Sequence, residues 1–202
     1  MPRRKKIILT VFLIILILAG ALVSAPGFLL YSSPYRKADA IVLFLGPDFT
    51  ARQKEAYKII SEGMADYLII PAYHKVYRIL DNGNIKYLSS NLIPRKLIKK
   101  KDSSAPEASF YEDTHIETLE AKKIMADFGL KSAVFVSSPY HMRRIKLIVT
   151  KVFTGEKGEF YFAPTHYEKA PGRLGDLSLA DWKKVGWEYV KIIWFSIYIL
   201  FV

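Results

Sequence analysis

The chain has 202 residues, 51% of them hydrophobic and 14% aromatic, which excludes a disordered protein and leaves room for one membrane segment and one domain. It has no cysteine, so disulfides and thiolate chemistry are excluded. The net charge of +11 includes four basic residues at positions 3–6; without them, 26 basic residues stand against 19 acidic ones. Such a surface favours anionic membranes or phosphorylated ligands. No nucleic-acid-binding module is recognisable, so we predict no nucleic-acid partner.

An apolar segment follows the basic N-terminus, and no charged residue occurs from Ile7 to Tyr35. About 19 helical residues span ~28 Å, close to the hydrocarbon thickness of a bilayer. We therefore predict a transmembrane anchor at residues 7–25, in contact with the lipid bilayer, and a juxtamembrane linker at 26–35. Because residues 1–6 are basic, the positive-inside rule places them in the cytoplasm and the rest of the chain outside it.

Two features mark the end of the anchor. Pro26-Gly27 is expected to end the helix. Val23-Ser24-Ala25 resembles a signal-peptidase site, so a cleaved signal peptide is the alternative to an uncleaved anchor. Pro26 directly after that site disfavours cleavage.

Residues 36–202 form one predicted domain, which opens with a βαβ unit. The apolar run 39–45 is typical of a central parallel strand. A helix is predicted from Thr50, with Gln53 as its capping-box partner, and 67–70 is a second buried strand. A unit of this kind predicts a parallel sheet with a right-handed crossover.

Residues 74–110 interrupt this alternation. Two short strands, 76–80 and 85–88, flank Asp81-Asn82-Gly83-Asn84, a strong hairpin signal. We predict that 74–110 is an excursion beside the sheet. A lid over the ligand crevice and a solvated insertion are both left open.

The alternation then resumes, which makes the predicted class α/β: a Rossmann-like, three-layer domain with a mainly parallel sheet. The uncharged stretch 192–202 is too short to span a bilayer; it can pack on the sheet, enter the membrane interface, or both. We expect it to pack on the sheet, with Trp194, Phe195 and Tyr198 near the membrane. The further predicted elements are a helix at 114–128 with a Thr114–Glu117 capping box, strands at 133–136 and 160–163, a loop at 164–178 and a helix at 181–202.

The stretch 137–144 contains several side chains that can bind a ligand or transfer a proton. It follows the strand 133–136 and precedes a helix, so it lies at the carboxyl end of a strand, where open α/β sheets bind ligands. The first turn of a helix also offers free N–H groups to an anion. His141 and Arg144, three residues apart, share a helix face. The alternative is an ordinary helix start with solvated arginines.

We assign candidate catalytic roles to His141 and Asp48. An unperturbed histidine titrates near neutrality, and an acid at the end of the first strand can bind a metal ion, a sugar hydroxyl or a proton; turn chemistry is the alternative for Asp48. Arg144 can bind phosphate or carboxylate with its planar fork. The full set of candidate substrate- or anion-binding residues is Arg52, Thr118, Glu120, Ser137, Ser138, Tyr140 and Arg144. For Thr118 and Glu120, a structural role in the first turns of the helix is the alternative.

The sequence lacks the motifs of metal sites, dinucleotide binding and serine hydrolases. His74, His115 and His166 have no metal-ligand spacing, and no G-x-G-x-x-G loop follows the first strand. Ser137 and Ser138 have no nucleophile-elbow context. We therefore predict no metal site and no cofactor.

Four motifs occur in the order found in the YdcF/ElyC/SanA-like family, which the chain resembles over most of residues 36–198. The resemblance implies a Rossmann-like domain of unknown function, whose anchored members are associated with envelope and peptidoglycan biogenesis, including lipid-carrier metabolism, at the bacterial inner membrane. The motifs are Ala38–Gly46 with Arg52 behind it, His115–Ala121, Val136–Arg144, which is the most specific, and Trp182–Tyr198 with Glu188 and Lys191.

The chain departs from the family pattern at several positions where the resemblance implies ligand contacts. Pro47-Asp48 replaces a second glycine, and Pro71-Ala72-Tyr73 replaces a Ser-Gly-Gly-like turn. Glu117 and Ala121 stand where asparagine is common. These departures put the family's ligand in doubt for this chain.

We therefore predict a membrane-anchored envelope protein whose strand-end crevice binds a phosphorylated or otherwise anionic cell-wall intermediate, including a lipid-linked one. An enzyme of this kind would be a hydrolase or transferase, with His141 as acid–base and Arg144 stabilising charge. A non-catalytic envelope scaffold is the alternative, and a cytoplasmic nucleotide-binding protein is a third. Protein partners cannot be predicted.

Overall fold

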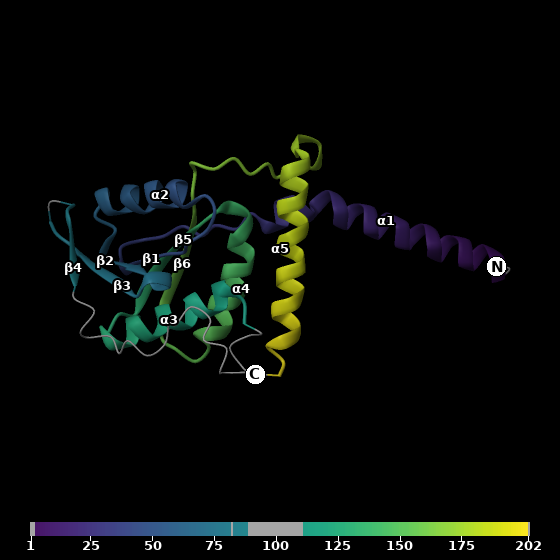
Figure 1. The fold of residues 1–202 in the computed structure, drawn as a ribbon. Helices are drawn as coiled ribbons and strands as arrows, with labels where there is room; N and C mark the ends of the chain where they lie inside the picture. The colour runs from purple at the N-terminus through teal and green to yellow at the C-terminus, as the bar shows by residue number, and fades with distance from the viewer. Residues whose placement is uncertain (1–2, 82, 89–110, 202) are drawn as a thin grey trace.

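A computed structural model describes residues 3–81, 83–88 and 111–201, and these residues form an α/β fold around one sheet (Figure 1). The strand order is β4-β3-β2-β1-β5-β6. β1, β2, β5 and β6 run parallel to one another, whereas β3 and β4 are antiparallel to their neighbours. The predicted α/β class with a mainly parallel sheet is confirmed. The strands are β1 (Ala38–Leu43), β2 (Ala65–Ile70), β3 (Lys75–Ile79), β4 (Ile85–Leu88), β5 (Ser132–Ser137) and β6 (Glu159–Pro164).

Helices cover both faces of the sheet, with α2 on one face and α3 and α4 on the other (Figure 1). α5 stands at one end of the domain, and α1 projects away from it. The helices are α1 (Arg3–Leu29), α2 (Phe49–Ser61), α3 (Asp113–Asp127), α4 (Met142–Val152) and α5 (Leu179–Tyr198), and the short 3-10 turns are η1 (Pro71–Tyr73), η4 (Pro139–His141) and η5 (Leu174–Asp176).

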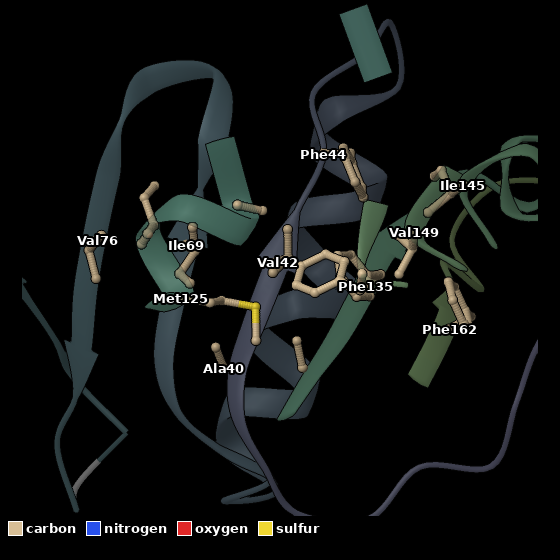
Figure 2. Close-up of a cluster of buried hydrophobic side chains, with 14 of the residues drawn as sticks. Ala40, Val42, Phe44, Ile69, Val76, Met125, Phe135, Ile145, Val149 and Phe162 are labelled. Atoms are coloured by element: carbon tan, nitrogen blue, oxygen red, sulfur yellow. The ribbon is translucent and has the colours of Figure 1, made fainter. Parts of the chain in front are cut away.

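The continuous apolar run of β1 is explained by burial on both faces. Val42 belongs to the cluster under α3 and α4, whereas Ile41 belongs to the cluster under α2. Figure 2 shows Met125 of α3 and Val149 of α4 on the first of these faces, close to Phe135 of β5. A sheet covered on both sides requires such runs rather than alternating strands.

The hairpin β3–β4 forms as predicted but extends the sheet instead of lying beside it. β3 pairs antiparallel with β2, so the two short strands form one end of the sheet. Gly83 has φ +76°, the left-handed conformation that the tight turn requires. The rest of the predicted excursion, residues 89–110, lies outside the described residues.

The predicted end of the first helix at Pro26-Gly27 is wrong, because α1 continues to Leu29. Proline removes one helical hydrogen bond, but tertiary contacts hold the last turn. Leu29 is fully buried, and the Tyr189 hydroxyl donates to the carbonyl of Ala25 at 2.9 Å. The first part of the predicted linker is therefore part of the domain's packing.

The remaining linker residues lie along the edge strand β6. The Ser33 N–H donates to the carbonyl of Phe162 at 3.0 Å, and the Phe162 N–H donates to the Ser33 hydroxyl at 2.9 Å. Tyr31 packs edge-on against Phe162. The segment thus covers a strand edge that would otherwise present unpaired backbone groups.

α1 is long and apolar enough to cross a membrane, and the side chains of its apolar segment are exposed. α5 packs on α4, on η4 and on the end of α1, so the expectation that its last part packs on the sheet is wrong. Phe195 and Tyr198 instead bury their rings against Ile148 of α4 and His115 of α3. The edge of the α3–α4 layer offers this apolar surface, which the sheet, already covered, does not.

Candidate functional site

The candidate site lies beyond the carboxyl ends of β1 and β5. β2 pairs with one side of β1 and β5 with the other, so the connections leaving these two strands turn to opposite faces of the sheet. This reversal opens the crevice in which α/β sheets bind ligands. The loop after β1, the first turns of α2, α3 and α4, and the inner face of α5 supply polar side chains to it.

Arg52 reaches the loop after β1 from the first turns of α2. Its side chain is almost completely buried; Nε donates to the Ser138 hydroxyl at 3.0 Å, and Nη1 donates to the carbonyls of Phe44 and Leu45. Its Nη2 has no hydrogen-bond partner in the described structure. Burial lowers the pKa of Arg52, although Glu168 and other acids oppose this. The guanidinium is therefore a buried cation without a contacting carboxylate among the described residues.

Gly46 makes room for this cation. A side chain at that position would overlap the guanidinium of Arg52. The glycine after the first strand is therefore needed for the close approach of Arg52 to the loop.

Glu117 approaches the same loop from α3. Its Oε2 accepts a hydrogen bond from the Leu45 N–H at 3.3 Å, while Arg52 binds the carbonyl of that residue. Burial raises the pKa of Glu117 to about 7, against the opposing effects of that hydrogen bond and of Arg52. A carboxyl group with this pKa can both take up and release a proton at neutral pH.

Arg144 is held by its own chain. Nε donates to Oε2 of Glu188 at 2.7 Å, and Nη1 donates to Oε1 of Glu112 at 2.9 Å and to the Thr114 hydroxyl at 2.7 Å. The side chains of Arg144 and Glu188 are 2% and 3% exposed, so the pair is sealed from solvent. Burial would lower the pKa of Arg144, but the two carboxylates raise it. Arg144 is thus neutralised internally, unlike Arg52.

His141 contacts the same network but keeps a quarter of its side chain exposed. Its Nδ1 lies 3.0 Å from Nη2 of Arg144 and 3.5 Å from Oε1 of Glu188. Because arginine can only donate, Nδ1 accepts, and the ring carries its proton on Nε2. Burial lowers the pKa of His141 to about 3, with Arg144 adding to this and Glu188 opposing it. The imidazole is a neutral hydrogen-bond donor at pH 7.

The two serines of the motif lie at the end of β5. Ser138 orients Arg52, as described above, and Ser137 is buried with its hydroxyl unpartnered in the described structure. A carboxylate oxygen of Glu112 and one of Glu168 are buried and unpartnered there as well. Native proteins leave few such groups; of these, the Ser137 hydroxyl can donate to an anionic ligand, whereas the two carboxylate oxygens can only accept.

Asp48 lies at the exposed rim of the crevice. It is the N-cap residue of α2, although its side chain makes no capping hydrogen bond. The Lys184 ammonium lies 3.6 Å from the Asp48 carboxylate and 3.1 Å from that of Glu168. The three charges link α2, the loop after β6 and α5.

Three predicted binding residues are engaged elsewhere. The Thr118 hydroxyl donates to the Thr114 carbonyl within α3. Glu120 pairs with Nδ1 of His74 at 2.8 Å, beyond the end of β2. Tyr140 is buried in the cluster around Leu29, and burial raises the pKa of its phenol to about 12. Each has a structural partner, and none contacts Arg52.

The predicted site residues leave out the glutamate side chains of the site. The predicted Thr114–Glu117 capping box is wrong, because α3 starts before Thr114, whose hydroxyl accepts a hydrogen bond from Arg144 instead. The Thr50–Gln53 capping box is likewise wrong, because α2 starts at Phe49. Glu188 appears in the sequence only as a member of the closing-helix motif, with no site role predicted for it. Nothing local in the sequence identifies Glu112 or Glu168.

Two hollows of the described structure lie away from the crevice. One is apolar and lies between α2 and strands β1–β4. The other is lined by Lys131, Ser132 and residues 157–159 at the opposite edge of the parallel strands.

Within the described residues, no three histidine, aspartate or glutamate side chains gather as a metal site would require; the absence of a metal or cofactor stays a prediction. Comparisons of the chain with protein-family models, with curated proteins and with solved structures return no match. Membership of the family that the four motifs resemble therefore also stays a prediction.

Proposed function

We propose that the chain is a membrane-anchored protein of the bacterial cell envelope, with a Rossmann-like domain whose β1–β5 crevice binds a phosphorylated or otherwise anionic envelope intermediate. α1 would cross the inner membrane with residues 1–6 in the cytoplasm and the domain outside. The apolar length of α1 and the basic residues before it support this placement. The motif resemblance supports the envelope role.

The observation that carries the proposal is the state of Arg52. A buried charge without a contacting carboxylate is costly, and in the part of the chain that the structure describes the guanidinium keeps one donor nitrogen unsatisfied. An anionic oxygen at that nitrogen would supply both the missing charge and the missing acceptor. This assigns anion binding to Arg52 rather than to Arg144.

We likewise assign proton transfer to Glu117 instead of His141. A group whose pKa is about 3 is a weak base at pH 7, whereas one at about 7 can act as acid or base. In a hydrolase or transferase acting on a phosphorylated intermediate, Glu117 would exchange the proton and Arg52 would stabilise charge. His141 would donate a hydrogen bond through Nε2.

Native mass spectrometry of the full-length protein in detergent tests anion binding. The probes are farnesyl phosphate, the matching alcohol farnesol, and inorganic phosphate. We expect farnesyl phosphate to bind and farnesol not to bind. Arg52→Met should weaken binding by about ten- to a hundredfold, the effect of losing a hydrogen bond to a charged group.

Arg78→Met is the matched control, because Arg78 is exposed on β3. If Arg52→Met fails to fold, Ser138→Ala serves instead, since it removes only the hydroxyl that orients Arg52. Equal binding by the wild type and both crevice variants would overturn the role of Arg52.

A non-catalytic scaffold is the second candidate, and one observation favours it. Glu188 and Glu112 bind Arg144 within the crevice, and the two hollows described above lie away from it. Failure of the folded wild type to bind any phosphorylated probe would favour this function.

A further inference from the structure

One side of α5 presents apolar side chains to solvent. From Gly186 to Phe201, every exposed position is apolar, glycine or serine. The Lys191 side chain, 32% exposed, lies at the edge of this surface, with its ammonium 3.3 Å from the Glu188 carboxylate. Six large side chains, between 49% and 84% exposed, form what we call the apolar stripe: Trp187, Val190, Ile193 and Ile197 of α5, and Leu200 and Phe201 directly after it. Trp194 lies on the same side of the helix and is 45% exposed. Soluble proteins rarely leave an apolar stripe of this length uncovered.

The stripe lies on one side of α5, opposite the residues that hold the helix to the domain. Trp187 and Trp194 are seven residues apart and therefore share a face. Val185, Glu188 and Phe195 are buried on the other side, where Glu188 binds Arg144. The stripe is thus not needed for packing the domain.

α1 leaves the domain beside this stripe. Tyr189 of α5 bonds to the Ala25 carbonyl, and its ring stacks on Phe28 with centroids 6.3 Å apart. From that contact α1 projects away from the domain on the far side of α5, and its axis runs across that of α5 rather than along it (Figure 1). A bilayer crossed by α1 would therefore extend along α5.

Basic and aromatic side chains surround the root of α1. The Arg143 guanidinium lies over the rings of Phe28 and Tyr31, 4.4 Å and 4.8 Å from their centroids, and Lys146 lies 4.3 Å from that of Tyr31. Cations attract anionic head groups, and tyrosine and tryptophan favour the membrane–water interface. The composition around the stripe matches a lipid surface.

We propose that α5 lies flat in the membrane interface, with the apolar stripe buried among lipid head groups and upper acyl chains. An uncharged face on a helix whose other face is bound to the domain is the pattern of an interfacial helix. The inference depends on α1 spanning the bilayer but not on the ligand of the crevice, so the two proposals can fail separately.

The three tryptophans of the chain, Trp182, Trp187 and Trp194, all lie in α5, so tryptophan fluorescence reports on this helix alone. Single-tryptophan variants of the full-length protein, made by replacing the other two with phenylalanine, are reconstituted in phosphatidylcholine–phosphatidylglycerol vesicles. Lipids brominated at different acyl positions quench tryptophans at the corresponding depth. We expect bromolipid to quench Trp187 and Trp194 several-fold more than half-buried Trp182, and both at a similar shallow depth.

Two further variants test the stripe itself. In the protein that retains only Trp187, Ile193→Glu with Ile197→Glu should abolish most of the quenching while α1 stays in the membrane. Tyr57→Glu, a new charge at an exposed apolar position of α2, should leave it unchanged. Ile193, Ile197 and Tyr57 are all exposed, so the added charges do not disturb the core.

Three outcomes would overturn the proposal. Equal, weak quenching of all three tryptophans would place α5 away from lipid. Quenching of Trp194 alone would mean that only the end of the helix enters the bilayer. Protection from quenching that disappears when the protein is diluted in lipid would assign the stripe to a second copy of the chain.

Discussion

The two buried arginines of the crevice, Arg52 and Arg144, differ in whether a carboxylate contacts the guanidinium. Arg144 has Glu188 and Glu112 as counter-charges and a pKa raised by them, whereas the pKa of Arg52 is lowered by burial. Arg52 has no contacting carboxylate among the described residues, and only the more distant charges of Glu168, Glu117 and Asp48 act on it. Arg144 therefore supports the structure, and Arg52 is the group that can gain from a ligand.

The raised pKa of Glu117 makes the stability of the protein depend on pH. Its pKa is raised from an ordinary 4.5 to about 7, so the folded protein holds a proton that the unfolded chain releases. The resulting stability is complete below about pH 4.5 and is lost as the pH rises through about 7. Glu117→Gln should match the wild type in urea unfolding at pH 4 and exceed it at pH 8 by up to about 3 kcal/mol.

The comparison between the two pH values is its own control, because any packing effect of the substitution is present at both. A difference in free energy of unfolding that stays constant from pH 4 to pH 8 would show that Glu117 has an ordinary pKa. It would also remove the reason for choosing Glu117 over His141 as the proton-transfer group.

At the scale of elements, the end of α1 belongs to the domain. Leu29 is fully buried with Tyr140 and Val185. Leu29→Ala should therefore destabilise the domain by about 2–5 kcal/mol, the cost of a cavity in a packed core. Urea unfolding of the full-length protein in detergent, followed by tryptophan fluorescence, measures the effect.

Leu22→Ala is the matched control, since Leu22 is 53% exposed in the same helix and contributes no core packing. If Leu29→Ala and Leu22→Ala unfold alike, residues 26–35 act as a loose linker, and the packing described for the end of α1 is wrong.

The elements themselves were largely predictable from the sequence, because buried strands such as β1 and β5 are continuous apolar runs bounded by turn residues. The hairpin was also predictable, but its position was not: pairing of Val76 with Ile69 of β2 joins it to the sheet, and register between strands is not a local property. The capping boxes failed for a related reason. A threonine caps a helix only if the chain enters the helix there, and both helices begin earlier.

The site was half predictable. The motif 137–144 and Arg52 do lie at the strand ends, because chain order and parallel pairing bring the ends of β1 and β5 together. The states of these residues depend on partners from distant elements, such as Glu188, 44 positions from Arg144. Partners so far apart in sequence meet only through packing, so the neutral His141 and the neutralised Arg144 could not be foreseen.

For the whole molecule, the proposed topology predicts which side of the membrane each end occupies. The chain has no cysteine, so single cysteines can be introduced freely. In spheroplasts, a membrane-impermeant thiol reagent should label Lys86→Cys on β4 and should label Pro2→Cys only after the cells are permeabilised. Pro2→Cys leaves all four basic residues in place. The opposite pattern would put the domain in the cytoplasm and favour a nucleotide-binding protein.

The hydrogen bonds between Ser33 and β6 limit how far the domain can move relative to α1. A flexible linker of ten residues would let the domain move roughly 17 Å from the end of α1. Here the linker is fixed between the buried Leu29 and the edge of the sheet. With α1 in a bilayer, the crevice would stay at one fixed distance from the lipid surface, because the domain could not rotate about a flexible linker. The protein and a lipid-linked ligand would then meet only by lateral diffusion in the membrane. The crevice would select ligands whose charged group lies at its own fixed distance from the membrane surface.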